Sequence, residues 1–389
     1  MLLHHKPLTH MTVYIHRLET AVPDTYYEQD FASELMQKNV SDRAAVKRVI
    51  RGVYNNTGIR KRHSVINDFN GSTDPALFFD PDGMKVAAPD THRRNDIYSR
   101  EARKLFVDLG DKLISRSPDF TKEDVTHVIT VSCTGFFAPG PDYYVVRELG
   151  LCGSTQRYHI GFMGCYAAFQ GLKMADSFCR SDPDAVVLVM CVELCTLHLQ
   201  FSDDTDSIIS ASVFGDGGAG ALVSARKPSA AADQNGTGTQ TPFQIRSFHS
   251  DLTSEGESDM AWTIGNEGFR MRLSTYVPEI IRKNIKPSLD NILRQAGVQH
   301  KDITRWAVHP GGRAILDKVQ QALGIPDEAM AASRDVLSEY GNMSSATVLF
   351  VLKKMAEEPA DGRSHTIFSM AFGPGLTLET GLFQTAGNA

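Results

Sequence analysis

Two segments dominated by apolar and β-branched residues constrain the fold of this chain most strongly. They are residues 126–132 (THVITVS) and 185–191 (AVVLVMC), and neither shows the strict apolar–polar alternation of a half-exposed strand. Runs of this kind are typical of central parallel strands that are covered by helices on both faces. Between them, residues 166–179 have helical length and small side chains that permit close packing. The order strand, loop, helix, strand predicts an α/β fold.

The second half of the chain repeats this order. Residues 305–308 predict a short strand that ends at His309, residues 344–354 predict a helix, and residues 366–370 predict another strand. Cys165 and Asn342 therefore stand in corresponding places, each at or just before the start of a predicted helix. This correspondence favours an internally duplicated α/β fold.

A low-complexity segment separates the two halves. Residues 226–242 are rich in Ala, Gly, Thr, Gln and Asn and have no apolar periodicity, which indicates a boundary or an exposed connection. We therefore expect one half over residues 1–228, carrying Cys165, and the other over residues 240–389, carrying His309 and Asn342.

Length and composition indicate a globular protein. With 389 residues the chain can bury a large core. The net charge of −6 gives no general attraction to nucleic acid or membranes. No apolar run approaches the ~20 residues that span a bilayer, and residues 1–10 contain no apolar signal core. We expect a cytoplasmic enzyme.

The six cysteines predict free thiols rather than a disulfide framework, because none forms a CxxC pair. Cys191, Cys195 and His198 have a spacing that only faintly resembles a metal site. Since the segment around Cys191 is predicted to be a buried strand, we expect no metal.

Three glycine-bearing segments carry residues suited to thioester chemistry. Cys165 lies in GFMGCYAAF, His309 precedes Pro-Gly-Gly, and Asn342 lies in YGNMSS. A helix N-terminus and a nearby imidazolium both lower the pKa of a thiol. The set predicts a thiol nucleophile with a base and an oxyanion partner. Each residue alone also has a structural interpretation: a small buried cysteine, a histidine at a strand end, and a helix-capping asparagine.

The motifs together resemble those of the type III polyketide synthases, the chalcone-synthase-like family. The resemblance covers essentially the whole chain, and its motifs are TAVP at 20–23, TGIRKR at 57–62, CTG at 133–135, APG at 138–140, the Cys165 segment, FGDG at 214–217, WAVHPGG at 306–312, EYGNMSS at 339–345 and FGPG at 372–375. The ketoacyl synthase III group also carries Cys, His and Asn, but usually lacks the HPGG and FGPG surroundings.

The resemblance implies a fold and a mechanism. The fold is the thiolase fold, two αβαβα halves in a five-layered arrangement, assembled as a homodimer. Cys165 would take an acyl group from a starter acyl-CoA, and His309 and Asn342 would stabilise the enolate that malonyl-CoA forms on losing CO2. Repeated Claisen condensation and cyclisation would give a pyrone or phenolic ring. No cofactor is implied beyond the CoA thioester substrates.

The resemblance also implies a reaction chamber. Phe214 matches a phenylalanine between the CoA tunnel and the chamber, and Met271 falls near a second gatekeeper position. Further implied substrate-binding positions are Cys133, Thr134, Ala138, Cys195, Leu197, His198, Ser344, Gly373 and Pro374. Several of these differ from the plant pattern, which favours a microbial-type enzyme without a plant-type aromatic starter. Ala138 replaces a methionine, and we expect this to open space for a long acyl chain.

A basic stretch is the candidate site for the CoA phosphates. Its predicted contacts are Lys47, Arg48, Arg51, Arg60 and Arg62. Gly52 and Asn56 stand where the family usually has basic residues, and a solvated helix face explains the same charges.

Two alternatives remain open at this stage. One is a ketoacyl synthase III-like enzyme that condenses once and takes its extender from an acyl carrier protein. The other is a catalytically silent protein on the same fold, against which the presence of Cys165, His309 and Asn342 together argues. The starter, the number of extensions, the use of methylmalonyl-CoA and the mode of cyclisation do not follow from the sequence.

Overall fold

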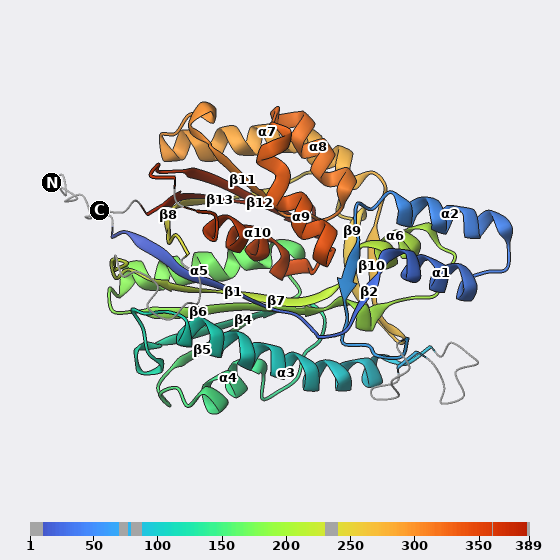
Figure 1. The fold of residues 1–389 in the computed structure, drawn as a ribbon, viewed down its shortest axis with the longest axis horizontal. Helices are drawn as coiled ribbons and strands as arrows, with labels where there is room; N and C mark the ends of the chain where they lie inside the picture. Colours follow the sequence, from blue (N-terminus) through green and yellow to red (C-terminus); the bar gives the residue numbers. More distant parts are fainter. Residues whose placement is uncertain (1–10, 70–76, 79–87, 230–239, 360, 387–389) are drawn as a thin grey trace.

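Five layers of alternating helix and sheet build the protein (Figure 1). The computed structural model describes residues 11–69, 77–78, 88–229, 240–359 and 361–386. The N-terminal residues 1–10 and most of the predicted boundary segment, residues 230–239, lie outside the described residues. The five-layered, duplicated arrangement expected from the sequence is confirmed.

Each layer is formed by elements from one or both halves. The first sheet contains β1 (Val13–Ala21), β7 (Asp216–Ser224), β6 (Val186–Leu194), β4 (His127–Ser132) and β5 (Gln156–Gly161). The second sheet contains β8 (Phe243–Leu252), β13 (Thr377–Thr385), β12 (Thr366–Gly373) and β11 (Arg305–Val308). Between the sheets lie α5 (Ala167–Ser181) and α10 (Thr347–Ala356). The outer layers are α3 (Thr91–Ser115) and α4 (Pro141–Leu149) on one side, and α7 (Val277–Ala296) and α8 (Arg313–Leu323) on the other.

The two sheets share one order of strands and directions. In the first, β1–β7 and β7–β6 are antiparallel and β6–β4 is parallel. In the second, β8–β13 and β13–β12 are antiparallel and β12–β11 is parallel. Among the described strands only β5 of this nine-stranded set has no counterpart. Pairing of β1 with β8 joins the two sheets at one place.

Strand β6 shows why a central strand of this fold has apolar side chains on both of its faces. All nine of its residues are buried. Val187, Val189 and Cys191 pack in the core around α5, whereas Leu188 and Met190 pack in the core that contains α3. Because side chains alternate across a strand, a strand covered on both faces needs an unbroken apolar run.

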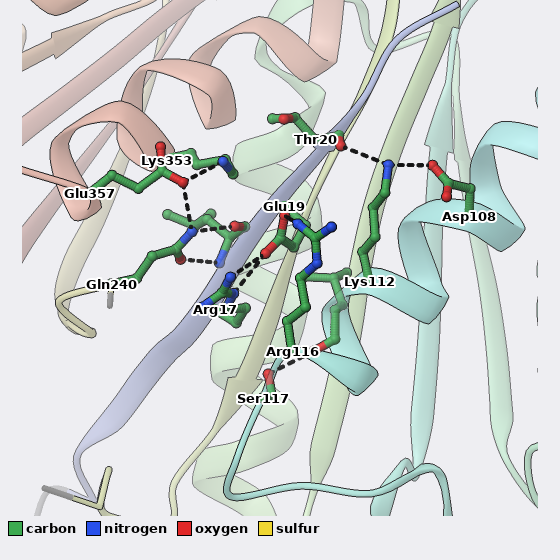
Figure 2. Close-up of polar contacts among 12 residues, drawn as sticks. Arg17, Glu19, Thr20, Asp108, Lys112, Arg116, Ser117, Gln240, Lys353 and Glu357 are labelled. Carbon is green, nitrogen blue, oxygen red and sulfur yellow. Dashed lines mark hydrogen bonds and ion pairs between the residues drawn. The ribbon is translucent and has the colours of Figure 1, made fainter. Parts of the chain in front are cut away.

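Polar contacts attach β1 to both of its neighbouring layers (Figure 2). The carboxylate of Glu19 is buried and binds Arg17 and, from the end of α3, Arg116. On the other side Gln240 donates to Leu18 O at 2.9 Å and accepts from Leu18 N at 3.0 Å. The Gln240 side chain also donates to Glu357, next to α10. The pairing of β1 with β8 covers only Val13 to Ile15 of β1. At Leu18 the side-chain amide of Gln240 instead satisfies the backbone N–H and C=O, as a neighbouring strand would.

Smaller elements surround the end of the sheets at which α5 and α10 begin. They are β2 (Tyr26–Glu28), α1 (Gln29–Asn39), α2 (Ala44–Asn55), β3 (Lys61–His63), α6 (Thr205–Val213), β9 (Met260–Gly265), β10 (Gly268–Leu273) and α9 (Ala331–Tyr340). Within the described residues, no helix combines the length and the apolar character needed to cross a membrane.

The predicted elements in both halves are present, with others between them. The strands at 126–132, 185–191, 305–308 and 366–370 are β4, β6, β11 and β12, and the two helices are α5 and α10. The simple order strand, loop, helix, strand is incomplete, because α4 and β5 lie between β4 and α5. Likewise α8 and α9 lie between β11 and α10.

Two mid-helix glycines predict opposite effects of the same substitution. A Cβ at Gly171 of α5 would lie 2.7 Å from Val189 Cγ1, whereas a Cβ at Gly52 of α2 would meet nothing within 4 Å. Gly171→Ala should lower the free energy of unfolding by about 1–3 kcal/mol through overpacking. Gly52→Ala should raise it by roughly 0.5–1 kcal/mol, because alanine favours the helix. Denaturant unfolding of both variants measures this, and shifts of equal sign would contradict the close packing of α5 on β6.

Candidate active site

Cys165, His309 and Asn342 line one small, buried cavity. Phe214 and Met271 also line it, together with Met260, Leu273, Gly311, Ile315 and Phe372. The three polar residues come from different halves of the chain, as the sequence correspondence suggested. Cys165 precedes α5, and Asn342 lies shortly before α10.

The turn that carries Cys165 is fitted closely against the C-terminal FGPG segment. Cys165 lies in the short 3-10 turn η2 (Gly164–Tyr166), which leads directly into α5. Gly164 has φ +80°, and a Cβ there would lie 2.3 Å from Pro374 Cδ. A Cβ at Gly373 would likewise lie 2.5 Å from the Tyr166 ring. Gly373 and Pro374 therefore support the cysteine turn from outside.

His309 follows β11 and is held by its backbone. Its N–H donates to Met370 O of β12 at 2.8 Å. Both ring nitrogens are buried and have no hydrogen-bond partner among the described residues. Burial lowers the pKa of His309 to about 3, so the free imidazole is neutral. An unpartnered buried imidazole facing a cavity can bind or exchange a proton with a substrate there.

A hydrogen-bond network orients the amide of Asn342. Its Oδ1 accepts from Ser344 N at 2.9 Å and from Thr347 Oγ1 at 3.4 Å. Because both partners are donors, they identify this atom of the amide as the oxygen. The nitrogen, Nδ2, therefore faces Cys165 Sγ at 4.0 Å and Gly311 O at 3.4 Å. The backbone of Asn342 also pairs with the chain at Val213 and Gly215, on either side of Phe214.

Burial and hydrogen bonding act in opposite directions on the Cys165 thiol. Burial raises the pKa of Cys165 to about 11, whereas hydrogen bonds from Ser344 and Asn342 lower it. Ser344 has φ +48°, an unusual conformation for a residue other than glycine. Donors directed at the sulfur favour its anionic form. The same donors can stabilise negative charge on a substrate oxygen.

Glu193 is a residue of the site that the sequence analysis missed. Its buried carboxylate accepts from Cys133 N and Thr134 Oγ1, both at 2.9 Å, and from Ser345 in the second half. Burial raises the pKa of Glu193, and these hydrogen bonds oppose that rise. The signal in the sequence was an acidic residue at the end of the apolar run of β6. The carboxylate ties the loop after β4 to the segment that carries Asn342.

A second and larger cavity adjoins the first. Phe214 and Met271 line it as well, and they therefore separate the two cavities. Cys195 and His198 line the larger cavity. His198 donates from one ring nitrogen to Thr134 O, accepts from Phe269 N with the other, and stacks on Phe269.

Several predicted chamber residues lie outside both cavities. Cys133 accepts from Gly164 N at 3.0 Å, so its thiol supports the Cys165 turn. Thr134 donates to Glu193, and Leu197 packs in the core with α3. Ala138 is exposed on the surface. Because Ala138 does not line either cavity of this chain, its small size does not enlarge them, contrary to our expectation.

The basic candidates for CoA binding divide into three groups. Lys47 and Arg51 line a polar groove between α1 and α2, and Arg48 is exposed nearby. Arg60 is half-exposed and pairs with Glu28 and Glu339. Arg62 is different, because it is buried and donates to Gln29, Ala211 O and Phe214 O. Its guanidinium holds the chain at Phe214 and is not accessible to a phosphate in solution, which corrects the sequence assignment.

The remaining cysteines and acidic residues show no metal site. In the described part of the chain, no three His, Cys, Asp or Glu side chains cluster as metal ligands would. All six cysteines are free thiols.

Comparisons with known proteins cover nearly the whole chain. The family model described as chalcone and stilbene synthases, N-terminal domain, matches residues 9–227, and that of the C-terminal domain matches residues 244–386. The alpha-pyrone synthesis polyketide synthase-like Pks18 of Mycobacterium tuberculosis is 30% identical over 372 residues, covering 95% of this chain and 90% of that protein.

Solved structures show the same architecture. PKS-I from the brown alga Ectocarpus siliculosus matches with a TM-score of 0.87 and 29% identity, covering 98% of this chain and 100% of that chain. The 1,3,6,8-tetrahydroxynaphthalene synthase of Streptomyces coelicolor, a bacterial type III polyketide synthase, matches with a TM-score of 0.82 and 26% identity, covering 97% and 100%.

Removing the Glu193 carboxylate should destabilise the site measurably. Glu193→Ala leaves buried donors of the Cys133–Thr134 loop without an acceptor, which costs roughly 1–3 kcal/mol for each unsatisfied group. Glu193→Gln keeps one acceptor oxygen and should lose much less. Denaturant unfolding compares the three proteins, and equal stability of the alanine variant and the unsubstituted protein would refute the linking role of Glu193.

Proposed function

The chain belongs to the chalcone and stilbene synthase family of type III polyketide synthases, and from this premise we propose how its residues perform the reaction. The family relationship makes the protein a condensing acyltransferase that decarboxylates its extender. We propose that Cys165 carries the growing acyl chain, and that His309 and Asn342 stabilise the enolate. The observation that supports these roles is the convergence of the three side chains in one buried cavity, with Asn342 Nδ2 directed at Cys165 Sγ.

Loading transfers an acyl group from CoA to Cys165. The sulfur attacks the thioester carbonyl as His309 takes the thiol proton, a new C–S bond forms, and the C–S bond to CoA breaks. His309 then returns the proton to the departing CoA thiolate. Neither charge is favourable in this buried site by itself, but the thiolate and the imidazolium form together and neutralise each other.

Condensation uses the same cavity a second time. Malonyl-CoA loses CO2, and the electron pair of the broken C–C bond becomes an enolate. Asn342 Nδ2 and the N–H group of the neutral His309 imidazole donate hydrogen bonds to the enolate oxygen. The enolate carbon attacks the acyl–Cys165 carbonyl, a C–C bond forms, and the Cys165 thiolate leaves. The product is an extended acyl-CoA, and the Cys165 thiolate attacks its thioester carbonyl and expels CoA thiolate, which begins another cycle.

The product class follows from repetition of this cycle. We propose several condensations and cyclisation to a pyrone or a resorcinol- or phloroglucinol-type ring; the name of Pks18 describes alpha-pyrone synthesis. The alternative, a single condensation with an extender on an acyl carrier protein, is not favoured by the family relationship. No cofactor takes part in the proposed steps.

We place the CoA phosphates near α2. Lys47, Arg48 and Arg51 stay the candidates, with Arg60 at the edge of the group, and Arg62 is removed because its donors bind the protein. Charge reversal at Arg51 should raise the KM for malonyl-CoA more than it changes kcat.

We also propose a homodimer. Among the described strands β5 pairs only with β4, so its outer edge is free. Phe136 and Phe162 are 51% and 37% exposed, with ring centroids 6.3 Å apart. A free strand edge beside exposed aromatic rings is typical of a contact between protein chains. Sedimentation equilibrium tests this, and a monomer at micromolar concentration would contradict it.

Product analysis with malonyl-CoA as the only extender tests the function itself. A panel of starter acyl-CoAs should yield triketide or tetraketide lactones or aromatic rings, detected by mass spectrometry. A single condensation product that requires a carrier protein would instead support the alternative.

Substitution of the three residues should separate the two chemical steps. Cys165→Ala should abolish condensation and leave weak malonyl-CoA decarboxylation, because the enolate site is intact. His309→Ala and Asn342→Ala should each reduce decarboxylation, by about 10²–10³-fold for the loss of one enolate donor. Radiolabelled CO2 release measures this step. Condensation at full rate by Asn342→Ala would refute its assigned role.

A further inference from the structure

The larger cavity runs from the catalytic cavity to the protein surface. At its inner end Phe214 and Met271 also line the catalytic cavity. At its outer end lie Tyr27, Phe31 and Phe69, whose rings contact one another. Phe31 is 39% exposed, so this end reaches solvent. Phe214 and Met271 are therefore the two side chains that lie between Cys165 and the larger cavity.

The side wall of this cavity is one face of α1. Phe31, Ala32, Leu35 and Met36 line it, at the spacing that places residues on a single side of a helix. These positions extend over about 7 Å of helix length. Ala211 of α6 lines the cavity as well. The wall is therefore apolar along the path from the inner end to the outer end.

The polar groups of the wall are largely engaged by the protein. The guanidinium of Arg62 donates to Gln29 and to two backbone carbonyls. Thr196 Oγ1 donates to Asp216, and both ring nitrogens of His198 are hydrogen-bonded. Ser210 is the exception, with a buried hydroxyl that has no partner among the described residues.

This wall chemistry distinguishes two kinds of occupant. The pantetheine arm of CoA carries two amides, and their burial without hydrogen-bond partners is unfavourable. A hydrocarbon chain needs no such partners, and its burial is favourable in proportion to its apolar area.

We propose that this cavity binds the hydrocarbon chain of the acyl group on Cys165, so that the enzyme takes long, apolar acyl-CoA starters. The thioester stays beside His309 and Asn342, the chain passes Phe214 and Met271, and its end lies along α1 toward the outer aromatic rings. Met271 is unbranched and adapts its shape to the passing chain. This inference rests on the proposed acylation of Cys165 and adds the class of starter.

The test fills the cavity from α1. Ala32→Trp places a large ring into the path, and Ala211→Leu narrows the cavity from α6 if the first variant folds poorly. Ala331→Trp is the matched control, because Ala331 is exposed on α9 and lines neither this cavity nor the groove of Lys47 and Arg51. Thermal unfolding checks that each protein is folded. Intact-protein mass spectrometry measures the rate of Cys165 acylation by acetyl-CoA and by palmitoyl-CoA.

The expected result is a change of chain-length preference. The palmitoyl-to-acetyl ratio of acylation rates should fall at least tenfold in Ala32→Trp and Ala211→Leu, and should be unchanged in Ala331→Trp. An unchanged ratio in both cavity variants would overturn the proposed role of the cavity, as would a preference of the unsubstituted enzyme for acetyl-CoA. Neither result would contradict the proposed acylation of Cys165. Failure of every acyl-CoA to acylate Cys165 overturns the proposed function as well.

Discussion

The burial of two helices between two sheets is the constraint on which the candidate active site depends. α5 and α10 are covered on both sides by β-sheet, and their core includes residues from both halves of the chain. Such helices need small or apolar residues all round and close approach to the strands, as at Gly171. Their beginnings lie at the same end of the sheets. This is why Cys165 and Asn342, far apart in the chain, face each other.

The same burial determines the chemistry available to the site. Burial raises the pKa of Cys165 and lowers that of His309, so the free site holds a neutral thiol and a neutral imidazole. The site compensates with directed donors: Asn342 Nδ2 faces the sulfur because its Oδ1 is occupied by Ser344 and Thr347. Glu193 fixes the adjoining loops to each other across the two halves. An anion formed in this cavity therefore meets groups already in position.

Predictions from the sequence succeeded where the evidence lay within one strand or helix. They failed where the position of a residue depends on contacts with distant segments. β4, β6, α5 and α10 were predictable, because elements in the middle of the fold are rich in apolar, β-branched and small residues. β5 was missed since it is a largely exposed edge strand with an ordinary polar sequence. Arg62 was assigned to CoA because a basic run does not reveal which of its members is buried. Ala138 was assigned to the chamber, but its position on the surface depends on how the loop after β4 folds.

By itself, the sequence determined the type of fold and the chemical groups of its motifs: apolar runs, glycine-bearing turns, the Cys165 thiol, the His309 imidazole and the Asn342 amide. These are local properties, since they depend on residues within a turn or a strand of one another. Only the tertiary structure decided which groups meet. Cys165 and Asn342 are 177 positions apart, and their contact depends on the packing of two sheets around two helices. The cavity along α1 likewise has walls from distant segments, and no single segment encodes its shape.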